Sequence, residues 1–174
     1  YACIDGVLLM ELVTDKDGDV APRLSEVDMS AEQALRDHSK VMRFVVRMLC
    51  AGLVHGDLSE FNILVDEGGP VIIDLPQAVD AAANNNAEAM FERDVNKISS
   101  YYGQFAPKLL QTNYAKEIWK LFEEGDLQAE TEITGLFTEN LEGADVDAVL
   151  REIQSAIAEE EQRLERKNEA DEQP

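Results

Sequence analysis

Two short apolar runs, 63–65 and 71–73, constrain the fold of this chain more than any other feature. Both consist of Ile, Leu and Val, and the segment between them, 66–70, contains an aspartate, a glutamate, two glycines and a proline. Turn-forming residues between two β-favouring runs predict a β-hairpin. Antiparallel pairing brings the residue before the first strand, Asn62, beside the residue after the second, Asp74, because neighbouring strands lie about 5 Å apart. An amide and a carboxylate are therefore expected side by side at the open end of the hairpin.

The loop before this hairpin supplies a second carboxylate, because Asp57 precedes Asn62 by five residues. Amide and carboxylate oxygens suit Mg²⁺, which usually completes its coordination with water and substrate phosphates. One carboxylate can hold the metal while the other accepts the proton of a hydroxyl nucleophile. These residues predict a phosphoryl-transfer site, in which either Asp57 or Asp74 could be the base and the other the metal ligand.

The surrounding sequence resembles a known family. Residues 53–62 read Leu-Val-His-Gly-Asp-Leu-Ser-Glu-Phe-Asn, and residues 72–77 read Ile-Ile-Asp-Leu-Pro-Gln. The spacing His-x-Asp-(x)4-Asn, with a later aspartate after an apolar strand, resembles the catalytic and metal loops of protein kinases. Neither Asp-Phe-Gly nor Ala-Pro-Glu occurs in the chain, and the residues present instead resemble the RIO family of atypical kinases. The resemblance extends over residues 4 to 105, although Asn84-Asn85 replaces the His-Pro often found in that family.

The resemblance implies roles for the matching positions. His55 could be read as a general base, but in kinase-like loops this histidine braces the loop by hydrogen bonds, and that is the role expected here. Asp57 would be the catalytic base, and Asn62 and Asp74 would ligate Mg²⁺, or Mn²⁺ in its place. In the RIO family the aspartate at the position of Asp74 is also implicated in accepting phosphate as an acyl-phosphate. Asp74 is therefore a candidate catalytic residue as well as a metal ligand.

The resemblance also implies an ATP site. Residues 8–13 are similar to the hinge that holds the adenine of ATP. Met10 would then lie behind the adenine, and the backbone of Glu11 and Val13 would hydrogen-bond its edge. Leu64, in the first strand of the hairpin, would pack under the face of the adenine.

Length and resemblance together imply one α+β domain with a protein-kinase-like fold. The chain has 174 residues and 45% hydrophobic content, enough to bury one core. We expect a mainly helical C-terminal lobe over 1–162, with a strand and hinge at 1–13, and a charged tail at 163–174. Its small β-hairpin would carry the catalytic and metal loops within 53–80. The nine residues before the hinge include one glycine and no lysine, so the glycine-rich loop and phosphate-binding lysine of an N-terminal lobe are missing. We expect the fragment alone to be inactive.

Apolar residues at helical spacing predict the helices of this lobe. The first begins after Ser30 and ends near Gly52, and two more are predicted over 87–103 and 114–123. His38 lies within the first helix and is expected to be a partly buried core residue. Two less regular stretches follow: 130–142, a short helix or irregular, and 145–164, an amphipathic stripe.

The charge of the chain limits its partners. It has 36 Asp and Glu against 15 Lys and Arg, a net charge of −21. Nucleic-acid affinity comes mostly from cations that replace counterions, so no direct binding to nucleic acid is expected. No apolar run approaches membrane-spanning length and no signal peptide is recognisable, which favours a cytoplasmic protein without a membrane partner. Cys3 and Cys50 suggest no disulfide framework and are expected to be reduced and buried.

Three functions stay open at this point. The first is ATP- and Mg²⁺-dependent transfer to Ser or Thr of a protein substrate, which includes the protein itself, or use of the same site as an ATPase. RIO proteins are associated with the precursor of the small ribosomal subunit, a partner that follows from family analogy only. The second is a small-molecule kinase of the aminoglycoside-phosphotransferase type, which has a similar His-Gly-Asp-Leu loop; residues 59–61 and 75–77 favour the RIO family. The third is a binding module without catalysis.

Overall fold

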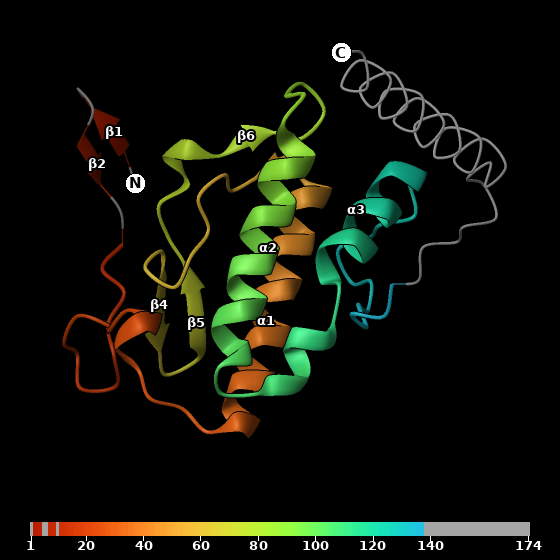
Figure 1. The fold of residues 1–174 in the computed structure, drawn as a ribbon. Coiled ribbons are helices and arrows are strands. Elements are labelled where there is room, and N and C mark those ends of the chain that lie inside the picture. Colours follow the sequence, from red (N-terminus) through yellow and green to blue (C-terminus); the bar gives the residue numbers. More distant parts are fainter. Residues whose placement is uncertain (1, 5–6, 10, 138–174) are drawn as a thin grey trace, which may run out of the picture. The chain divides into compact units, whose positions relative to one another are not determined.

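The computed structural model describes residues 2–4, 7–9 and 11–137, and for the first two of these segments it describes the backbone only. Three sequence predictions lie outside the described residues: the role of Met10, the amphipathic stretch 145–164 and the charged tail 163–174. The described part is α+β, as the sequence predicts (Figure 1). In chain order, with η for short 3-10 helices, its elements are β1 (Ala2–Ile4), β2 (Val7–Leu9), η1 (Leu24–Glu26), α1 (Ala31–Cys50), β3 (Leu53–Val54), β4 (Ile63–Asp66), β5 (Gly69–Ile72), η2 (Leu75–Gln77), β6 (Val79–Asp80), α2 (Ala87–Gly103), η3 (Pro107–Gln111) and α3 (Tyr114–Glu124).

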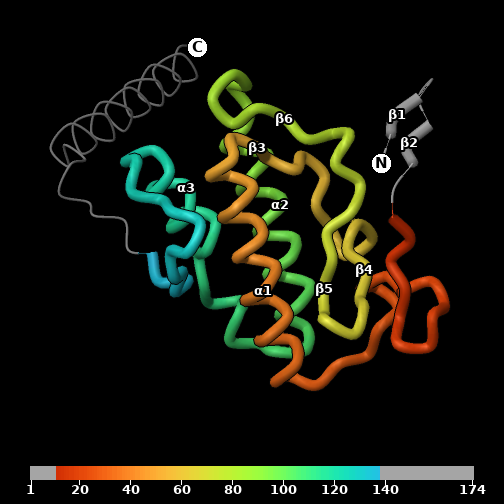
Figure 2. Tube along the Cα trace, turned by 180° about the vertical axis from the view of Figure 1, so that it is seen from behind, coloured from red at the N-terminus to blue at the C-terminus, as the bar shows by residue number. Residues whose placement is uncertain are grey.

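The three helices agree closely with the sequence prediction. Helix α1 begins after Ser30, whose side chain accepts a hydrogen bond from the Gln33 backbone N–H at 3.2 Å and so caps the first turn. Helices α1 and α2 lie side by side and run in opposite directions, and α3 packs against both (Figures 1 and 2). None of the helices in the described residues is long and apolar enough to cross a membrane.

The core lies where the buried faces of the three helices meet. Burial of these side chains is the main favourable contribution to folding, at about 1.5–3 kcal/mol for each large apolar residue. The rings of Phe91 of α2 and Trp119 of α3 pack against each other at a tilt of 43°, with centroids 5.5 Å apart. The buried apolar residues of the helices include Val41, Met42, Val45, Val46 and Leu49 of α1, Phe91, Val95, Ile98 and Tyr102 of α2, and Ile118 and Trp119 of α3.

His38 belongs to this core, as the sequence predicts, and is buried more fully than expected, with 1% of its surface exposed. Its Nε2 lies 3.0 Å from the Ser99 hydroxyl oxygen, and its ring contacts Tyr102 and Tyr114 at centroid distances of 5.7 and 4.8 Å. These three partners are uncharged at neutral pH. Burial therefore lowers the pKa of His38 to about 4, because the charged imidazolium loses its hydration.

This burial predicts a pH-dependent stability. Below pH 6.5 the unfolded chain protonates His38 while the folded chain does not, so the free energy of unfolding falls as the pH drops toward 4. The loss of stability reaches about 3 kcal/mol near pH 4. It vanishes as the pH rises above 6.5, because His38 is then neutral in both the folded and the unfolded chain. Urea unfolding of wild type and His38→Gln, followed from pH 7.5 to 4.5, measures it. Equal pH dependence in the two proteins would contradict the prediction.

Cys50 corrects one expectation from the sequence. Its thiol is free and exposed rather than buried, and its Sγ lies 3.7 Å from the Leu127 carbonyl oxygen. Leu49 is fully buried, and consecutive residues of a helix point about 100° apart. Cys50 therefore faces outward at the end of α1. The side chain of Cys3 lies outside the described residues.

Residues 130–137 form neither helix nor strand, which selects the irregular alternative for the described part of 130–142. The Glu117 carboxylate of α3 holds this segment. It accepts hydrogen bonds from the backbone N–H groups of Thr134, at 3.0 Å, and Gly135, at 2.5 Å. The segment is thus tied to the helical core without regular structure of its own.

Candidate active site

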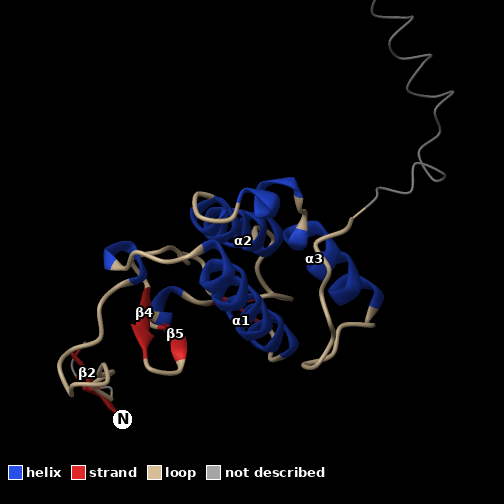
Figure 3. Cartoon of the chain, turned by 90° about the horizontal axis from the view of Figure 1, so that it is seen from below, coloured by secondary structure: helices blue, strands red, loops and turns tan. Residues whose placement is uncertain are grey.

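Two antiparallel strand pairs position the predicted catalytic and metal loops. Strand β4 pairs with β5, and β3 pairs with β6, so residues 55–62 leave one strand pair and enter the other while residues 73–78 return beside them. The Ile73 N–H donates to the Asn62 carbonyl oxygen at 3.0 Å and joins the two loops. Figure 3 shows the hairpin and α3 on opposite sides of α1. The hairpin is thus anchored to the helical core through α1.

The hairpin register differs from the predicted one by a single residue. Ile63 pairs with Ile72, which places Asn62 opposite Ile73 and leaves Asp74 one residue further along. The turn explains the shift, because it closes tightly between Asp66 and Gly69. The Asp66 carboxylate accepts the Gly68 N–H at 2.6 Å, and Gly69 adopts a φ of +107°, a conformation that favours glycine.

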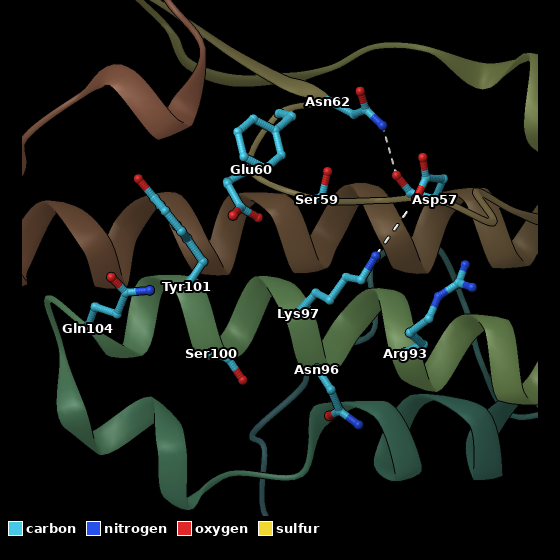
Figure 4. Close-up of a pocket in the computed structure, with 11 residues that line it drawn as sticks. Asp57, Ser59, Glu60, Asn62, Arg93, Asn96, Lys97, Ser100, Tyr101 and Gln104 are labelled. Atoms are coloured by element: carbon cyan, nitrogen blue, oxygen red, sulfur yellow. Dashed lines mark hydrogen bonds and ion pairs between the residues drawn. The ribbon is translucent and has the colours of Figure 1, made fainter.

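Asp57 lies in the loop after β3, with 45% of its side chain exposed. The Asn62 amide donates to the backbone carbonyl oxygen of Asp57 at 2.8 Å and closes the loop. Lys97 of α2 reaches the same residue from the other side, with its Nζ 3.8 Å from Asp57 Oδ1 (Figure 4). The carboxylate is therefore accessible to a ligand while its backbone is fixed.

A buried aspartate of α2 supports this loop. Asp94 is 3% exposed, and its Oδ2 accepts the Gly56 N–H at 2.8 Å. Its Oδ1 lies 3.2 Å from Arg93 Nη2, and the same guanidinium group donates to the Gly56 carbonyl oxygen. Asp94 and Arg93 of α2 therefore hold both backbone polar groups of the residue before Asp57, and they pre-position Asp57 through its backbone.

Gly56 has no room for a side chain. Its φ is +84°, and a Cβ would lie 2.8 Å from the Gln77 carbonyl oxygen and 2.9 Å from Met90 Cε. Since Gln77 belongs to the metal loop, a methyl group here would push the two loops apart.

Gly56→Ala is therefore expected to lower the free energy of unfolding by about 2–4 kcal/mol, from the strained φ and the backbone overlap together. Gly18→Ala is the matched control, because Gly18 has the same φ of +84° with nothing within 4 Å of its Cβ. Urea titration of both variants separates overlap from strain. If Gly56→Ala and Gly18→Ala lost the same free energy of unfolding, the contact with Gln77 would not destabilise the fold, and the prediction would be wrong.

His55 has the bracing role that the sequence predicts. It is 3% exposed, its Nε2 lies 2.9 Å from the Ile73 carbonyl oxygen, and the Asp57 N–H points to its Nδ1 at 3.4 Å. The ring thus joins the catalytic loop to the end of the hairpin. Its two nitrogens are therefore engaged by the protein.

Asp74 is exposed and adopts a left-handed backbone conformation, with φ 69° and ψ 50°. Among the described residues it is the one non-glycine residue with a positive φ. Such a conformation costs free energy, and strained residues of this kind cluster at functional sites. It also ends the strand sharply, so that the chain turns into η2 at this point.

The donor set here fits a metal ion that shares its coordination with phosphate. The Asn62 amide donates through its nitrogen, which leaves its oxygen available, and Asp74 offers an exposed carboxylate one residue beyond Ile73. No group of three or more His, Cys, Asp or Glu side chains within the described residues could hold a metal unaided. Mg²⁺ commonly uses one or two protein oxygens together with waters and substrate phosphates, and so suits such a pair.

The predicted adenine-binding residues are only partly described. Glu11 is exposed, while Val13 and Leu64 are partly buried. The Val13 carbonyl oxygen accepts the Ala21 N–H at 3.0 Å, and Arg23 forms an isolated antiparallel bridge with Leu64. The segment 21–23 therefore links Val13 to Leu64 of β4, the residue predicted to pack under the adenine.

An open groove of about 800 Å³ runs beside Asp57. Residues of the catalytic loop form one wall, and α2 forms the other (Figure 4). The α2 wall is the part that reasoning from sequence missed, together with the support from Asp94. The sequence contains one indication of the role of Asp94, because this charged residue interrupts the apolar face of α2 between Phe91 and Ile98. The residues that line the α2 wall are Arg93, Asn96, Lys97, Ser100, Tyr101 and Gln104.

The loop aspartate beside a short hairpin, supported by a buried aspartate of a central helix, is consistent with the protein-kinase-like class of α+β folds. A family model described as the RIO domain matches residues 1–115. The chain therefore belongs to the RIO domain family, which confirms the resemblance seen in the catalytic and metal loops.

Several relatives carry the name of serine/threonine-protein kinases. RIO-type kinase Rio1 of Haloferax volcanii is 43% identical over 96 residues, 55% of this chain and 32% of the relative. The rio2 kinase of Schizosaccharomyces pombe is 32% identical over 129 residues, 74% of this chain and 35% of the relative. RIO-type kinase Rio2 of Methanocaldococcus jannaschii is 34% identical over 108 residues, 61% of this chain and 39% of the relative. The chain spans about a third of the length of these curated relatives.

Proposed function

We propose that this chain carries the catalytic and metal loops of an ATP- and Mg²⁺-dependent protein serine/threonine kinase of the RIO type. The observation that carries the proposal is Asp57, an accessible carboxylate on a loop whose backbone is held by Asn62, Arg93 and Asp94. Phosphoryl transfer depends mainly on placement and electrostatics, and a fixed, accessible base meets the first requirement. The names of the relatives support the same reaction class.

In this proposal each residue has a defined task. Asp57 orients the acceptor hydroxyl and takes its proton as the new bond to phosphorus forms. Mg²⁺-ATP supplies the phosphoryl group, with Asn62 and Asp74 as the metal ligands and Glu11, Val13 and Leu64 near the adenine. The exposed carboxylate of Asp74 also makes it the candidate acceptor of an acyl-phosphate.

The groove favours a polypeptide acceptor over a small molecule. It follows α2 from Arg93 to Gln104, which is about 16 Å at 1.5 Å per helical residue. An extended chain covers that length with about five residues, whereas small-molecule sites are clefts or cavities that bury about 70–90% of the ligand surface, more than an open groove covers. The proposed acceptor is therefore a serine or threonine within an extended segment, of another protein or of this one.

Transfer of labelled phosphate from Mg²⁺-ATP to protein tests the proposal, in the longest natural polypeptide that contains this sequence. Wild type is expected to label protein, and Asp57→Asn to reduce the rate by about 10²- to 10⁴-fold. Asp126→Asn, a change of an exposed aspartate outside the groove, is the control. Undiminished labelling in Asp57→Asn would refute the role of Asp57, and ADP formation without labelled protein would indicate an ATPase instead.

A further inference from the structure

We infer that Lys97 is the cation that contacts the phosphoryl group during its transfer. The inference rests on the function proposed above. Lys97 lies on α2, and its side chain crosses the groove toward the catalytic loop. Its Nζ lies 3.8 Å from Asp57 Oδ1 (Figure 4). A catalytic carboxylate with a cation at this distance already has the two charges that phosphoryl transfer requires on the acceptor side.

The ion pair has little value as a stabilising contact. The side chains of Lys97 and Asp57 are 42% and 45% exposed, and pairs as exposed as this contribute at most about 1 kcal/mol. A similar pair in α3, Lys120 with Glu124 at 3.9 Å, lies away from the groove. Ion pairs with this geometry therefore occur in places where no chemistry is proposed. The feature that distinguishes Lys97 is its location beside Asp57.

The two loops supply no cation of their own. Residues 55–62 and 73–78 contain neither lysine nor arginine, although they contribute the carboxylates of Asp57 and Asp74. Arg93 also lines the groove, but its guanidinium group is engaged by the Gly56 carbonyl oxygen and by Asp94. Of the two cations that line the groove, Lys97 is thus the one that does not brace the loop.

Lys97 can reach the position where negative charge accumulates. A hydroxyl hydrogen-bonded to Asp57 lies about 2.7 Å from the carboxylate, and the attacked phosphorus lies about 3–3.5 Å beyond it. The Lys97 ammonium group already lies 3.8 Å from Asp57 Oδ1. Rotation about the bonds of its flexible four-carbon stem can bring it to the phosphoryl oxygens. When Asp57 turns to the acceptor hydroxyl, the ammonium group is released to the phosphoryl oxygens.

In the proposed step the γ-phosphoryl group of ATP passes to the acceptor hydroxyl. The bond from the acceptor oxygen to the γ-phosphorus forms as the bond from that phosphorus to the β,γ-bridging oxygen breaks. The hydroxyl proton passes to Asp57, and ADP leaves with the electron pair on its bridging oxygen. Lys97 stays protonated and neutralises charge on the non-bridging oxygens, a role that preorganised cations perform in phosphoryl transfer.

The test compares Lys97→Met, Lys97→Arg and Lys120→Met in the longest natural polypeptide that contains this sequence. The affinities for Mg²⁺-ATP and Mg²⁺-ADP are measured by calorimetry, and kcat by transfer of label to protein. Lys97→Met is expected to lower kcat by about 100-fold and to reduce the preference for ATP over ADP by about tenfold. Lys97→Arg should recover most of both quantities, and Lys120→Met should change neither.

A second comparison separates contact with phosphate from screening of Asp57. In an Asp57→Asn background, Lys97→Met should still reduce the preference for ATP over ADP, because the phosphoryl contact remains to be lost. Loss of that effect in the Asp57→Asn background would mean that Lys97 only neutralises Asp57, and would overturn the inference. The inference would also be overturned if wild type transferred phosphate and Lys97→Met did so with the same kcat. If wild type itself transferred no phosphate, the proposed function would be refuted instead.

Discussion

Asp94→Ala is expected to lower the free energy of unfolding by about 2–4 kcal/mol, a large effect for one side chain. Asp94 is 3% exposed and accepts the Gly56 N–H at 2.8 Å. Its removal leaves that buried N–H without an acceptor and releases Arg93 from the carboxylate that orients it. Because Gly56 precedes Asp57, kcat is expected to fall together with stability.

Asp94→Asn refines this prediction. The amide keeps one oxygen for the Gly56 N–H and loses the charge that faces Arg93, so its effect on stability should be smaller than that of alanine. Asp126→Ala is the control for loss of an exposed aspartate, and its unfolding curve should overlay that of wild type. Urea titration measures all three variants. If Asp94→Ala unfolded at the wild-type urea concentration, the loop would not depend on α2 for its support.

Asp57→Asn and Asp74→Asn are expected to separate catalysis from metal binding. Asp57→Asn should lower the rate of transfer to protein by about 10²- to 10⁴-fold and leave the affinity for Mg²⁺-ATP near that of wild type, because Asp57 acts on the acceptor. Asp74→Asn should weaken Mg²⁺-ATP binding by about 10- to 100-fold, through loss of a charged metal ligand. Asparagine tolerates the left-handed conformation of Asp74, so the backbone at φ 69° is preserved and the charge alone is tested.

Calorimetric titration of each variant with ATP at several Mg²⁺ concentrations gives the required affinities. The Asp74→Asn deficit should shrink as Mg²⁺ increases, whereas Asp57→Asn should show the wild-type dependence on Mg²⁺. Asp15→Asn is a control for a loop aspartate whose carboxylate serves only a local turn, where it accepts the N–H groups of Asp17 and Asp19. Equal nucleotide affinity in the wild type and both site variants would contradict this division of roles.

Much of the fold could be predicted from sequence because its signals are local. The three helices follow from apolar residues at helical spacing and from end signals such as Ser30, which caps α1 in the structure. The hairpin follows from turn formers between two β-favouring runs, and the family follows from spacings within 53–62 and 72–77. In each case the residues that carry the information are close together in the chain.

The hairpin register shows where this local information ends. The composition of 66–70 indicates a turn, but the choice between registers depends on how the turn closes, here through the Asp66 carboxylate and the positive φ of Gly69. A shift of one residue moves Asp74 away from the position directly opposite Asn62. The buried Cys50 predicted from its apolar surroundings was wrong for a related reason, because the end of a helix can rotate out of the core.

The amino-acid sequence by itself determined the residues of the candidate site, Asp57, Asn62 and Asp74, and the strands that present them, since spacing along the chain is enough to predict these. Only the tertiary structure decided what surrounds Asp57. Asp94 and Lys97 are 38 and 40 residues from the groups they contact, Gly56 and Asp57. Such contacts depend on which segment α2 packs beside, and apolar periodicity predicts that a helix has a buried face without specifying the segment against which that face packs. That packing gives the Asp57 loop its support from Asp94 and places a cation, Lys97, beside the Asp57 carboxylate.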